Sequence, residues 1–239
     1  MKRAPLAPEQ LEKLKQFDSC TIANAIEEFD IRLRNAGFAD SSIRCLFEDF
    51  PPMVGYAATV RIRTAEPPME GHSYFDRLDW LDHVLSIPAP RVVVIQDMDS
   101  HPGLGSFIGE IHASILLALG CVGAVTNGGV RDLPAVRAMN FPLFARNVCV
   151  SHAFAHIFDF GKPLEMGHLE VQPGDLIHGD RHGFQTIPVE IADKVPARAH
   201  RIAEEEQEII RVCRSADFSL TKLRNAVSSL GIKRQDIKP

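Results

Sequence analysis

The apolar positions along the chain change repeatedly between helical and strand spacing. Leu11 and Leu14, which follow Pro8, predict a short first helix. A second helix is predicted to begin where Asp18 or Ser19 can cap it. Its inward face consists of Ile22, Ala25, Ile26 and Phe29. The chain is therefore expected to begin with two helices.

The central part of the sequence alternates strands with helices. The run RVVVIQ, from Arg91, is a continuous β-branched segment typical of a strand that is buried on both faces. A short helix would turn Leu133, Val136 and Met139 inward. The other predicted elements are strands over 54–64, 122–126 and 141–148 and a long helix over about 108–119. The order strand, helix, strand, helix, strand predicts a parallel α/β core.

The later part of the sequence has a different character. The segment HLEVQPGDLIHGDRHGFQTIP reads as short strands separated by tight turns, which predicts antiparallel pairing. A charged helix is predicted over about 191–214, and the final segment, 222–239, carries five cations against one acid. We expect a single domain over residues 1–214, followed by a basic surface extension over residues 215–239.

Composition excludes several classes of protein. A chain of 239 residues, of which 45% are hydrophobic, can bury the core of one large domain. Its net charge of −5 gives no basic surface for nucleic acid, and no apolar run approaches the ~18 residues of a membrane helix. The five cysteines are scattered, and the start of the chain has no apolar signal segment. We therefore expect a cytoplasmic protein without nucleic-acid or membrane partners.

A glycine-rich turn, GLGSFIG, lies between the buried strand and the long helix. Gly103, Gly105 and Gly109 do not have the spacing of a dinucleotide-binding loop, and no acid lies at the distance that would suit a ribose. The turn can still expose backbone N–H groups at the start of a helix, where a carboxylate or a phosphate can bind. The alternative is a tight turn without a ligand.

The segment TNGGVRD brings Arg131 and Asp132 to the start of the short helix. The simple explanation is structural, because aspartate is a preferred N-cap worth ~1 kcal/mol and a neighbouring arginine can pair with it. The functional explanation is that Asp132 offers a hard oxygen ligand for Mg²⁺ or Mn²⁺, while Arg131 supplies a permanent positive charge. Such a site would bind a small oxyanion.

Several histidines and acids elsewhere in the chain can also be either structural or functional. His152 and His156, in SHAFAH, would face the same way on a helix, and His178 and His182 flank a turn in the late strands. All four can be structural residues. The acidic run Glu204, Glu205, Glu206 and Glu208 reads as a solvated helix face, unless the site of another subunit reaches one of these acids.

The sequence as a whole resembles the RraA-like family. The resemblance rests on GEIHASILLALGCVGAVTNGGVRD, FPLFARNV and VQPGDLIHGDRHGFQTIP, and it extends over about residues 10–210 through SCTIANAI and VGYAATVRIRT. This family includes the metal-dependent 4-hydroxy-4-methyl-2-oxoglutarate aldolases and the regulator of ribonuclease E activity. The resemblance implies a swivelling β/β/α fold of class α/β, assembled as a homotrimer or a pair of trimers with the site between subunits.

The same resemblance implies a role for each site residue. Asp132 matches the carboxylate that holds the divalent metal, Mg²⁺ or Mn²⁺, and Arg131 matches the arginine beside the keto oxygen of a small 2-keto acid substrate. The backbone amides of Glu110 and Ile111, directly after Gly109, match those that receive the substrate carboxylate. These roles agree with the anion site considered for the glycine turn.

The implied activity is that of a lyase. It would cleave a C–C bond of a 4-hydroxy-2-oxo acid, or decarboxylate oxaloacetate to pyruvate, through an enolate whose charge the metal and Arg131 stabilise. One position departs from the family aldolases, which carry an acid three residues after the aspartate where this chain has Ala135. The ribonuclease regulator also lacks that acid and is not an aldolase. A non-catalytic protein that binds and regulates a ribonuclease is therefore the alternative.

Overall fold

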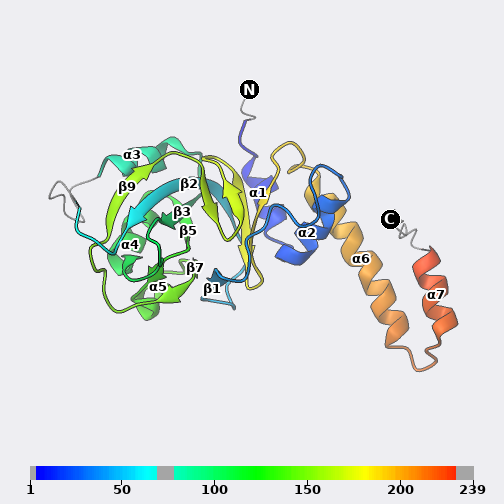
Figure 1. Ribbon diagram of the computed structural model, residues 1–239. Helices are drawn as coiled ribbons and strands as arrows, with labels where there is room; N and C mark the ends of the chain where they lie inside the picture. Colours follow the sequence, from blue (N-terminus) through cyan, green and yellow to red (C-terminus); the bar gives the residue numbers. More distant parts are fainter. Residues whose placement is uncertain (1–3, 69–77, 230–239) are drawn as a thin grey trace.

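A mixed β-sheet forms the centre of the molecule (Figure 1). The computed structural model describes residues 4–68 and 78–229. Across the sheet, the strands follow one another as β1 (Arg44–Cys45), β7 (Leu143–Ala145), β5 (Cys121–Thr126), β3 (Arg91–Asp97), β2 (Met53–Arg63), β12 (Leu176–Asp180) and β13 (Gly183–Ile187), and β9 (His156–Phe160) also pairs with β2.

The middle of this sheet is parallel, as the sequence predicts. Strands β2, β3, β5 and β7 run in the same direction, each paired with the next. On β3, Val93 and Ile95 face one hydrophobic core, whereas Val92 and Val94 face the other. The expected burial of this strand on both faces is therefore confirmed.

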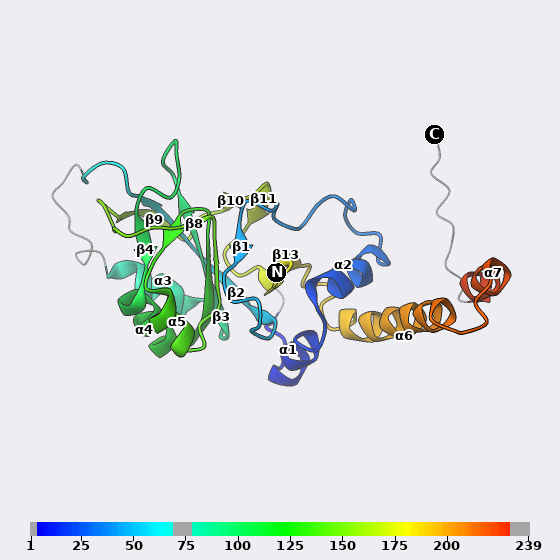
Figure 2. The same cartoon turned by 90° about the horizontal axis from the view of Figure 1, so that it is seen from below.

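The helices form two groups (Figures 1 and 2). One group covers a face of the parallel strands and consists of α3 (Asp79–Ser86), α4 (Glu110–Ala118) and α5 (Leu133–Ala138). The other gathers beyond β12 and β13 and consists of α1 (Pro8–Leu14), α2 (Ser19–Glu27) and α6 (Val195–Cys213). The first two helices begin as predicted, and the Asp18 side chain caps α2 by accepting a hydrogen bond from the Thr21 N–H at 2.7 Å. None of the described helices combines the length and the apolarity needed to cross a membrane.

The late strands are antiparallel, which confirms the prediction from their turns. Strand β10 (Leu164–Met166) pairs with β11 (Leu169–Val171), and this hairpin packs on the second face of the sheet. Strand β12 pairs with β13 on one side and with β2 on the other, both antiparallel. The second hairpin thus joins the parallel core to the helices α1, α2 and α6.

A second, smaller sheet was not predicted. It consists of the parallel strands β4 (Ser106–Ile108), β6 (Gly129–Val130) and β8 (Asn147–Val148). The predicted strand over 141–148 is therefore two strands, because the chain leaves the main sheet after β7 and enters the small one. Arg146 marks this crossing, since its N–H donates to the carbonyl of Gly128 at 3.3 Å.

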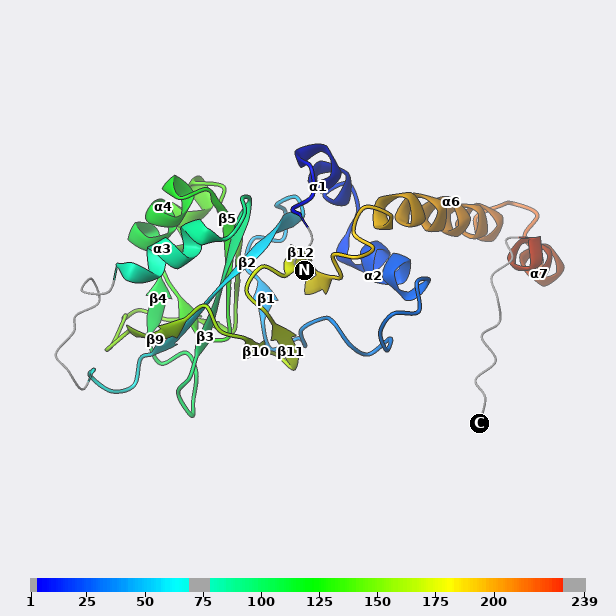
Figure 3. The same ribbon diagram turned by 90° about the horizontal axis from the view of Figure 1, so that it is seen from above.

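The extension that follows residue 214, expected as a surface tail, contains a helix. Residues Leu220–Ser229 form a helix, α7, none of whose side chains is buried. Figures 1 and 3 show α6 projecting from the body, with α7 at its far end. The rest of the predicted tail, 230–239, lies outside the described residues.

Candidate functional site

The small sheet brings the two predicted site segments together. Ser106 pairs with Gly129, and the Arg131 N–H donates to the Ile108 carbonyl at 3.0 Å. Strand β4 leads directly into Gly109 and α4, while β6 leads into the segment before α5. The start of α4 and the start of α5 therefore lie side by side, although 22 residues separate Glu110 from Asp132 along the chain.

The Asp132 side chain does not cap its own helix. It occupies the N-cap position of α5 with a left-handed backbone (φ 56°, ψ 35°), but its carboxylate turns to the neighbouring helix. Atom Oδ2 accepts a hydrogen bond from the Glu110 N–H at 3.0 Å and lies 3.5 Å from Nε of Arg131. The simple capping explanation is therefore wrong for α5, because this carboxylate satisfies the first amide of α4.

Gly109 allows the Asp132 carboxylate to come close to the first turn of α4. Its backbone is extended, which any residue can adopt, but a Cβ at this position would lie 2.4 Å from Oδ2 of Asp132. The glycine is thus required by the closeness of the carboxylate. Because Asp132 already accepts from the Glu110 amide, the carboxylate of a substrate at this amide would have to replace it.

The site is open to solvent and electrically mixed. The side chains of Arg131 and Asp132 keep 31% and 41% of their surface exposed, so a small ligand can reach both. Ile111, in the first turn of α4, is also exposed. The N-terminus of α4 and the guanidinium both favour an anion here, whereas the Asp132 carboxylate favours a cation. An oxyanion and a metal ion that bind together suit this combination.

Few side chains of the described residues could hold a metal ion together. Across residues 4–68 and 78–229, no group of three or more His, Cys, Asp and Glu side chains converges as a metal site. A structural zinc site, which requires four protein ligands, is therefore not formed by these residues. Mg²⁺ commonly keeps several waters and uses one or two carboxylates together with oxygens of the substrate. A single exposed carboxylate such as Asp132 fits that mode.

His152 and His156 do not lie on a helix. His152 belongs to an irregular segment, and His156 is the first residue of β9. In each, Nδ1 lies 2.7 Å from a backbone carbonyl, of Ala153 and of Phe154 respectively. The shared helical face considered from their spacing is therefore absent.

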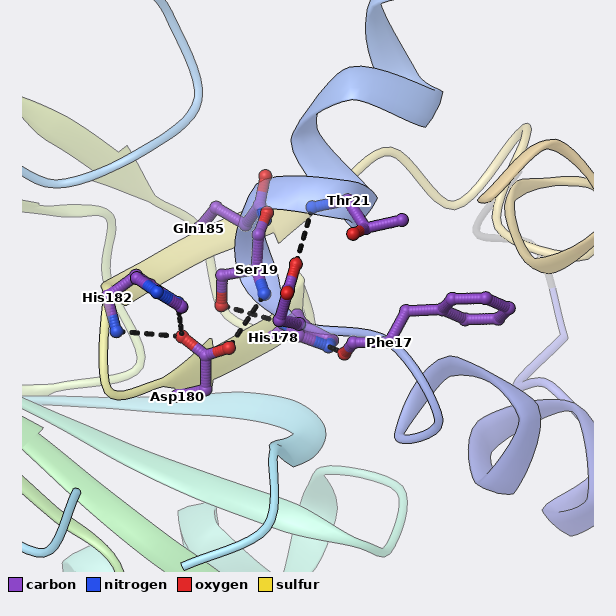
Figure 4. A network of polar contacts seen from close by, with 8 residues as sticks. Phe17, Ser19, Thr21, His178, Asp180, His182 and Gln185 are labelled. Atoms are coloured by element: carbon purple, nitrogen blue, oxygen red, sulfur yellow. Dashed lines mark hydrogen bonds and ion pairs between the residues drawn. The ribbon is translucent and has the colours of Figure 1, made fainter. Parts of the chain in front are cut away.

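His178 and His182 belong to a structural network that ties β12 to α2 (Figure 4). The His178 ring lies between the Ser19 hydroxyl, 3.1 Å from Nδ1, and the Phe17 carbonyl, 3.1 Å from Nε2. Asp180 accepts from the backbone N–H groups of Ser19 and His182, both at 2.8 Å. Burial lowers the pKa of His178, so the ring is neutral. These contacts support the structural interpretation of both histidines.

The acidic run on α6 is partly paired within the chain. Glu205 pairs with Arg201 at 2.6 Å, and Glu204 lies 3.6 Å from His200. Glu206 accepts from the Asn24 amide at 3.3 Å, and Glu208 pairs with Arg211. These exposed contacts agree with a solvated helix face.

Two polar residues close to Arg131 were not singled out from the sequence. His112, in the first turn of α4, is 4% exposed and packs against Phe107, with 4.5 Å between ring centroids. Burial lowers its pKa to about 4, and the charge of Arg131 acts in the same direction. Burial raises the pKa of the Cys149 thiol, while Arg131 opposes that change. A single histidine within an apolar helix gave no signal beyond its residue type.

A buried carboxyl group, Asp97, was also missed. It is the last residue of β3, is 2% exposed, and accepts a hydrogen bond from the Gly103 N–H at 2.8 Å. A signal existed, because Asp97 and Asp99 directly follow a buried parallel strand, and ligand sites of α/β proteins form at the carboxyl ends of such strands.

The fold and this site define a mixed α/β protein with an open polar site where the small sheet delivers two helix N-termini. The chain belongs to the RraA-like family, since the family model described as Aldolase/RraA matches residues 19–185. The fold expected from the resemblance is confirmed.

Individual relatives agree with this assignment. A protein of Halalkalibacterium halodurans, named as a candidate 4-hydroxy-4-methyl-2-oxoglutarate aldolase, is 35% identical over 81 residues, which cover 34% of this chain and 39% of that protein. The chain spans less than half the length of the curated relatives that it matches.

Two solved structures share the fold. An uncharacterized protein from Pseudomonas syringae pv. tomato superposes with a TM-score of 0.73 at 24% identity, covering 96% of this chain and 97% of that chain. The RraAS2 protein of Streptomyces coelicolor, described as an unusual member of the RNase ES inhibitor RraA family, superposes with a TM-score of 0.66 at 23% identity, covering 85% and 97%.

Proposed function

We propose that the protein is a divalent-metal-dependent lyase that acts on small 2-keto acids. It would cleave the C–C bond of a 4-hydroxy-2-oxo acid, as a 4-hydroxy-4-methyl-2-oxoglutarate aldolase does, or decarboxylate oxaloacetate to pyruvate. The observation that carries the proposal is the junction of the Asp132 carboxylate, the Arg131 guanidinium and the first amide of α4. The similarity to a candidate aldolase supports the substrate class.

The chemistry follows from where charge develops. Cleavage of a bond β to a ketone leaves an enolate, and the same enolate arises when oxaloacetate loses CO₂. Arg131 would face the keto oxygen and stabilise its growing negative charge, while the first amides of α4, at Glu110 and Ile111, would hold the substrate carboxylate. Asp132 would hold Mg²⁺ or Mn²⁺, which supplies Lewis-acid stabilisation of the same charge when it is bound.

The proposed site is completed by a second copy of the chain, in a homotrimer or a pair of trimers. The exposure of the site supports this. Within this chain, Ala135 leaves the site without the acid that the family aldolases carry. Helix α6 projects from the body and carries the acids Glu204, Glu206 and Glu208, so it can reach a neighbouring subunit (Figure 3). An acid from that helix would replace the missing carboxylate.

The alternative function is regulation of a ribonuclease by binding without catalysis. Ala135 is the observation that favours it, because the ribonuclease regulator also lacks the acid. In that case the Arg131 and Asp132 pair would only join α4 to α5, and the substitution of Asp132 would change no reaction rate.

A pyruvate assay separates these functions. Release of pyruvate from oxaloacetate and from 4-hydroxy-4-methyl-2-oxoglutarate is measured with Mg²⁺ or Mn²⁺, with a chelator, and in Asp132→Ala. We expect chelation to abolish activity and Asp132→Ala to lower kcat/KM by about 100-fold or more, because both remove stabilisation of the enolate. Asp217→Ala, which removes an exposed carboxylate outside the site, is the matched control and should retain full activity.

Metal binding is measured directly alongside activity. Mn²⁺ titrations followed by electron paramagnetic resonance should show a site in the native protein and in Asp217→Ala that is weakened in Asp132→Ala. Pyruvate release that persists in chelator and in Asp132→Ala would contradict the metal mechanism. No release from either substrate would favour the ribonuclease regulator.

A further inference from the structure

Asp97 lies where the two loops that lead to the proposed site meet the main sheet. Its Oδ2 atom accepts the Gly103 N–H at 2.8 Å, which fixes the glycine turn before β4. Its backbone pairs with the Asn127 side chain, with N–H to Oδ1 at 2.7 Å and Nδ2–H to the carbonyl at 3.1 Å. This second contact fixes the turn before β6. The carboxyl group of Asp97 thus anchors the first loop, and its backbone anchors the second.

The distance from these anchors to the site is short. From Gly103, the chain passes through the three-residue strand β4 to Gly109 and the Glu110 amide. From Asn127, it passes through the two-residue strand β6 to Arg131 and Asp132. The fit is tight, since a Cβ on Gly128 would lie 3.2 Å from the Cβ of Asp97. A shift at Asp97 would therefore be transmitted to both halves of the site.

Asp97 also has a carboxyl partner, Asp99. The Oδ2 atom of Asp99 accepts from the backbone N–H groups of Thr64 and Ala65, at 2.7 and 2.8 Å, and from the Thr64 hydroxyl at 3.0 Å. The Asp99 N–H in turn donates to Oδ1 of Asp97 at 3.1 Å. Both oxygens of the Asp97 carboxyl group therefore accept a backbone N–H, one from Gly103 and one from Asp99.

The surroundings shift the pKa values of the two carboxyl groups in opposite directions. Burial raises the pKa of Asp97. Burial also opposes ionisation of Asp99, but the hydrogen bonds from Thr64 and Ala65 outweigh it and lower the pKa of that carboxyl. The Cys149 thiol also lies close to Asp97, and burial raises its pKa.

We propose that Asp97 is a positioning residue of the proposed active site, and that its carboxyl group holds the glycine turn by accepting from the Gly103 and Asp99 N–H groups. These two contacts join the glycine turn to the end of β3. The effect on catalysis rests on the proposed function, whereas the effect on the two loops does not.

The test compares Asp97→Asn with Asp97→Ala. The asparagine oxygen can still accept from Gly103, whereas alanine accepts from neither N–H group. We expect Asp97→Asn to keep kcat/KM within about threefold of native and Asp97→Ala to lose about 10-fold to 100-fold, as for groups that orient the residues of a site. Rescue by the amide would show that the hydrogen bond to Gly103 carries the effect.

A measurement without any substrate separates this proposal from the proposed function. Amide hydrogen exchange at Gly103 and Glu110 should accelerate at least about tenfold in Asp97→Ala and remain native in Asp97→Asn, since loss of an anchoring hydrogen bond opens a loop locally. If the enzyme proves inactive but the exchange pattern holds, only the proposed function fails. Equal acceleration in both variants, or no change at Glu110 in Asp97→Ala, would overturn the positioning role.

If Asp97→Ala does not fold, Asn127→Ala provides a second test. It removes both side-chain bonds to the Asp97 backbone from a partly exposed position and leaves the carboxyl pair intact. Mn²⁺ affinity should fall about tenfold, with the Gly103 amide still protected. Native Mn²⁺ affinity in this variant would show that Asp97 does not position the Asp132 half.

Discussion

At the scale of single residues, the candidate site depends on contacts that the sequence shows only in part. Gly109 and the Arg131 and Asp132 pair could each be found from their neighbours along the chain. Their contact could not, because the register between β4 and β6 sets it. The left-handed backbone of Asp132, a conformation that aspartate tolerates better than most residues, turns its carboxylate toward α4.

His112 predicts a pH dependence of stability. Its pKa is about 4 in the folded protein, against 6.5 for a free histidine, so only the unfolded chain gains a proton between these values. The contribution of His112 is therefore fully present above pH 6.5 and is lost as the pH falls toward 4, by about 3 kcal/mol in total. The measurement is the free energy of unfolding in urea at pH 7.5 and at pH 4.5.

The variant His112→Leu is the control for this effect. Leucine fills a similar space with an apolar side chain and cannot bind a proton. His178, whose pKa burial also lowers, contributes in the same direction in both proteins, so the difference between them isolates His112. An equal loss of stability at pH 4.5 in His112→Leu and in the native protein would contradict the prediction.

At the scale of elements, the length of each strand or helix determined whether its pattern could be recognised in the sequence. The β-branched run of β3 and the turn residues of the late hairpins have clear patterns, and these elements form as expected. Strands β4, β6 and β8 have only two or three residues, too few to show a period. Helix α3 was missed as well, although Trp80 and Val84 form its buried face.

The contact between α4 and the start of α5 predicts the effect of Gly109→Ala. Alanine adopts the extended backbone of Gly109 without strain, but its Cβ would meet the Asp132 carboxylate at 2.4 Å. The carboxylate must then leave the Glu110 amide, so we expect the free energy of unfolding to fall by about 1 kcal/mol. Urea unfolding measures this change.

A double-mutant cycle gives this prediction its control. In the background of Asp132→Ala the clash is absent, so adding Gly109→Ala should change stability little. If Gly109→Ala costs the same with and without Asp132, the glycine is required for a reason other than the carboxylate.

At the scale of the whole molecule, a body that carries the site is distinct from a helical arm. The first half of α6 belongs to the body, since Val195, Ala199 and Ile202 are buried against it. Beyond them α6 projects outward, and α7 has no buried residue (Figure 1). Near the site, by contrast, Leu104, Val148, Val150 and Phe154 expose large apolar side chains. Contact with a neighbouring subunit would remove this exposed apolar surface from water.

We expect the apolar side chains near the site to mediate assembly and the helical arm to contribute little to it. A chain that ends at Arg214 tests this. It lacks α7, so its melting temperature should stay within about 3 °C of native, because little apolar area is lost from the folded state. Sedimentation should give the same number of subunits, three or six, for both chains, since the exposed apolar side chains near the site remain. If truncation instead yields monomers, α7 holds the subunits together, and the boundary between domain and extension at residue 214 is wrong.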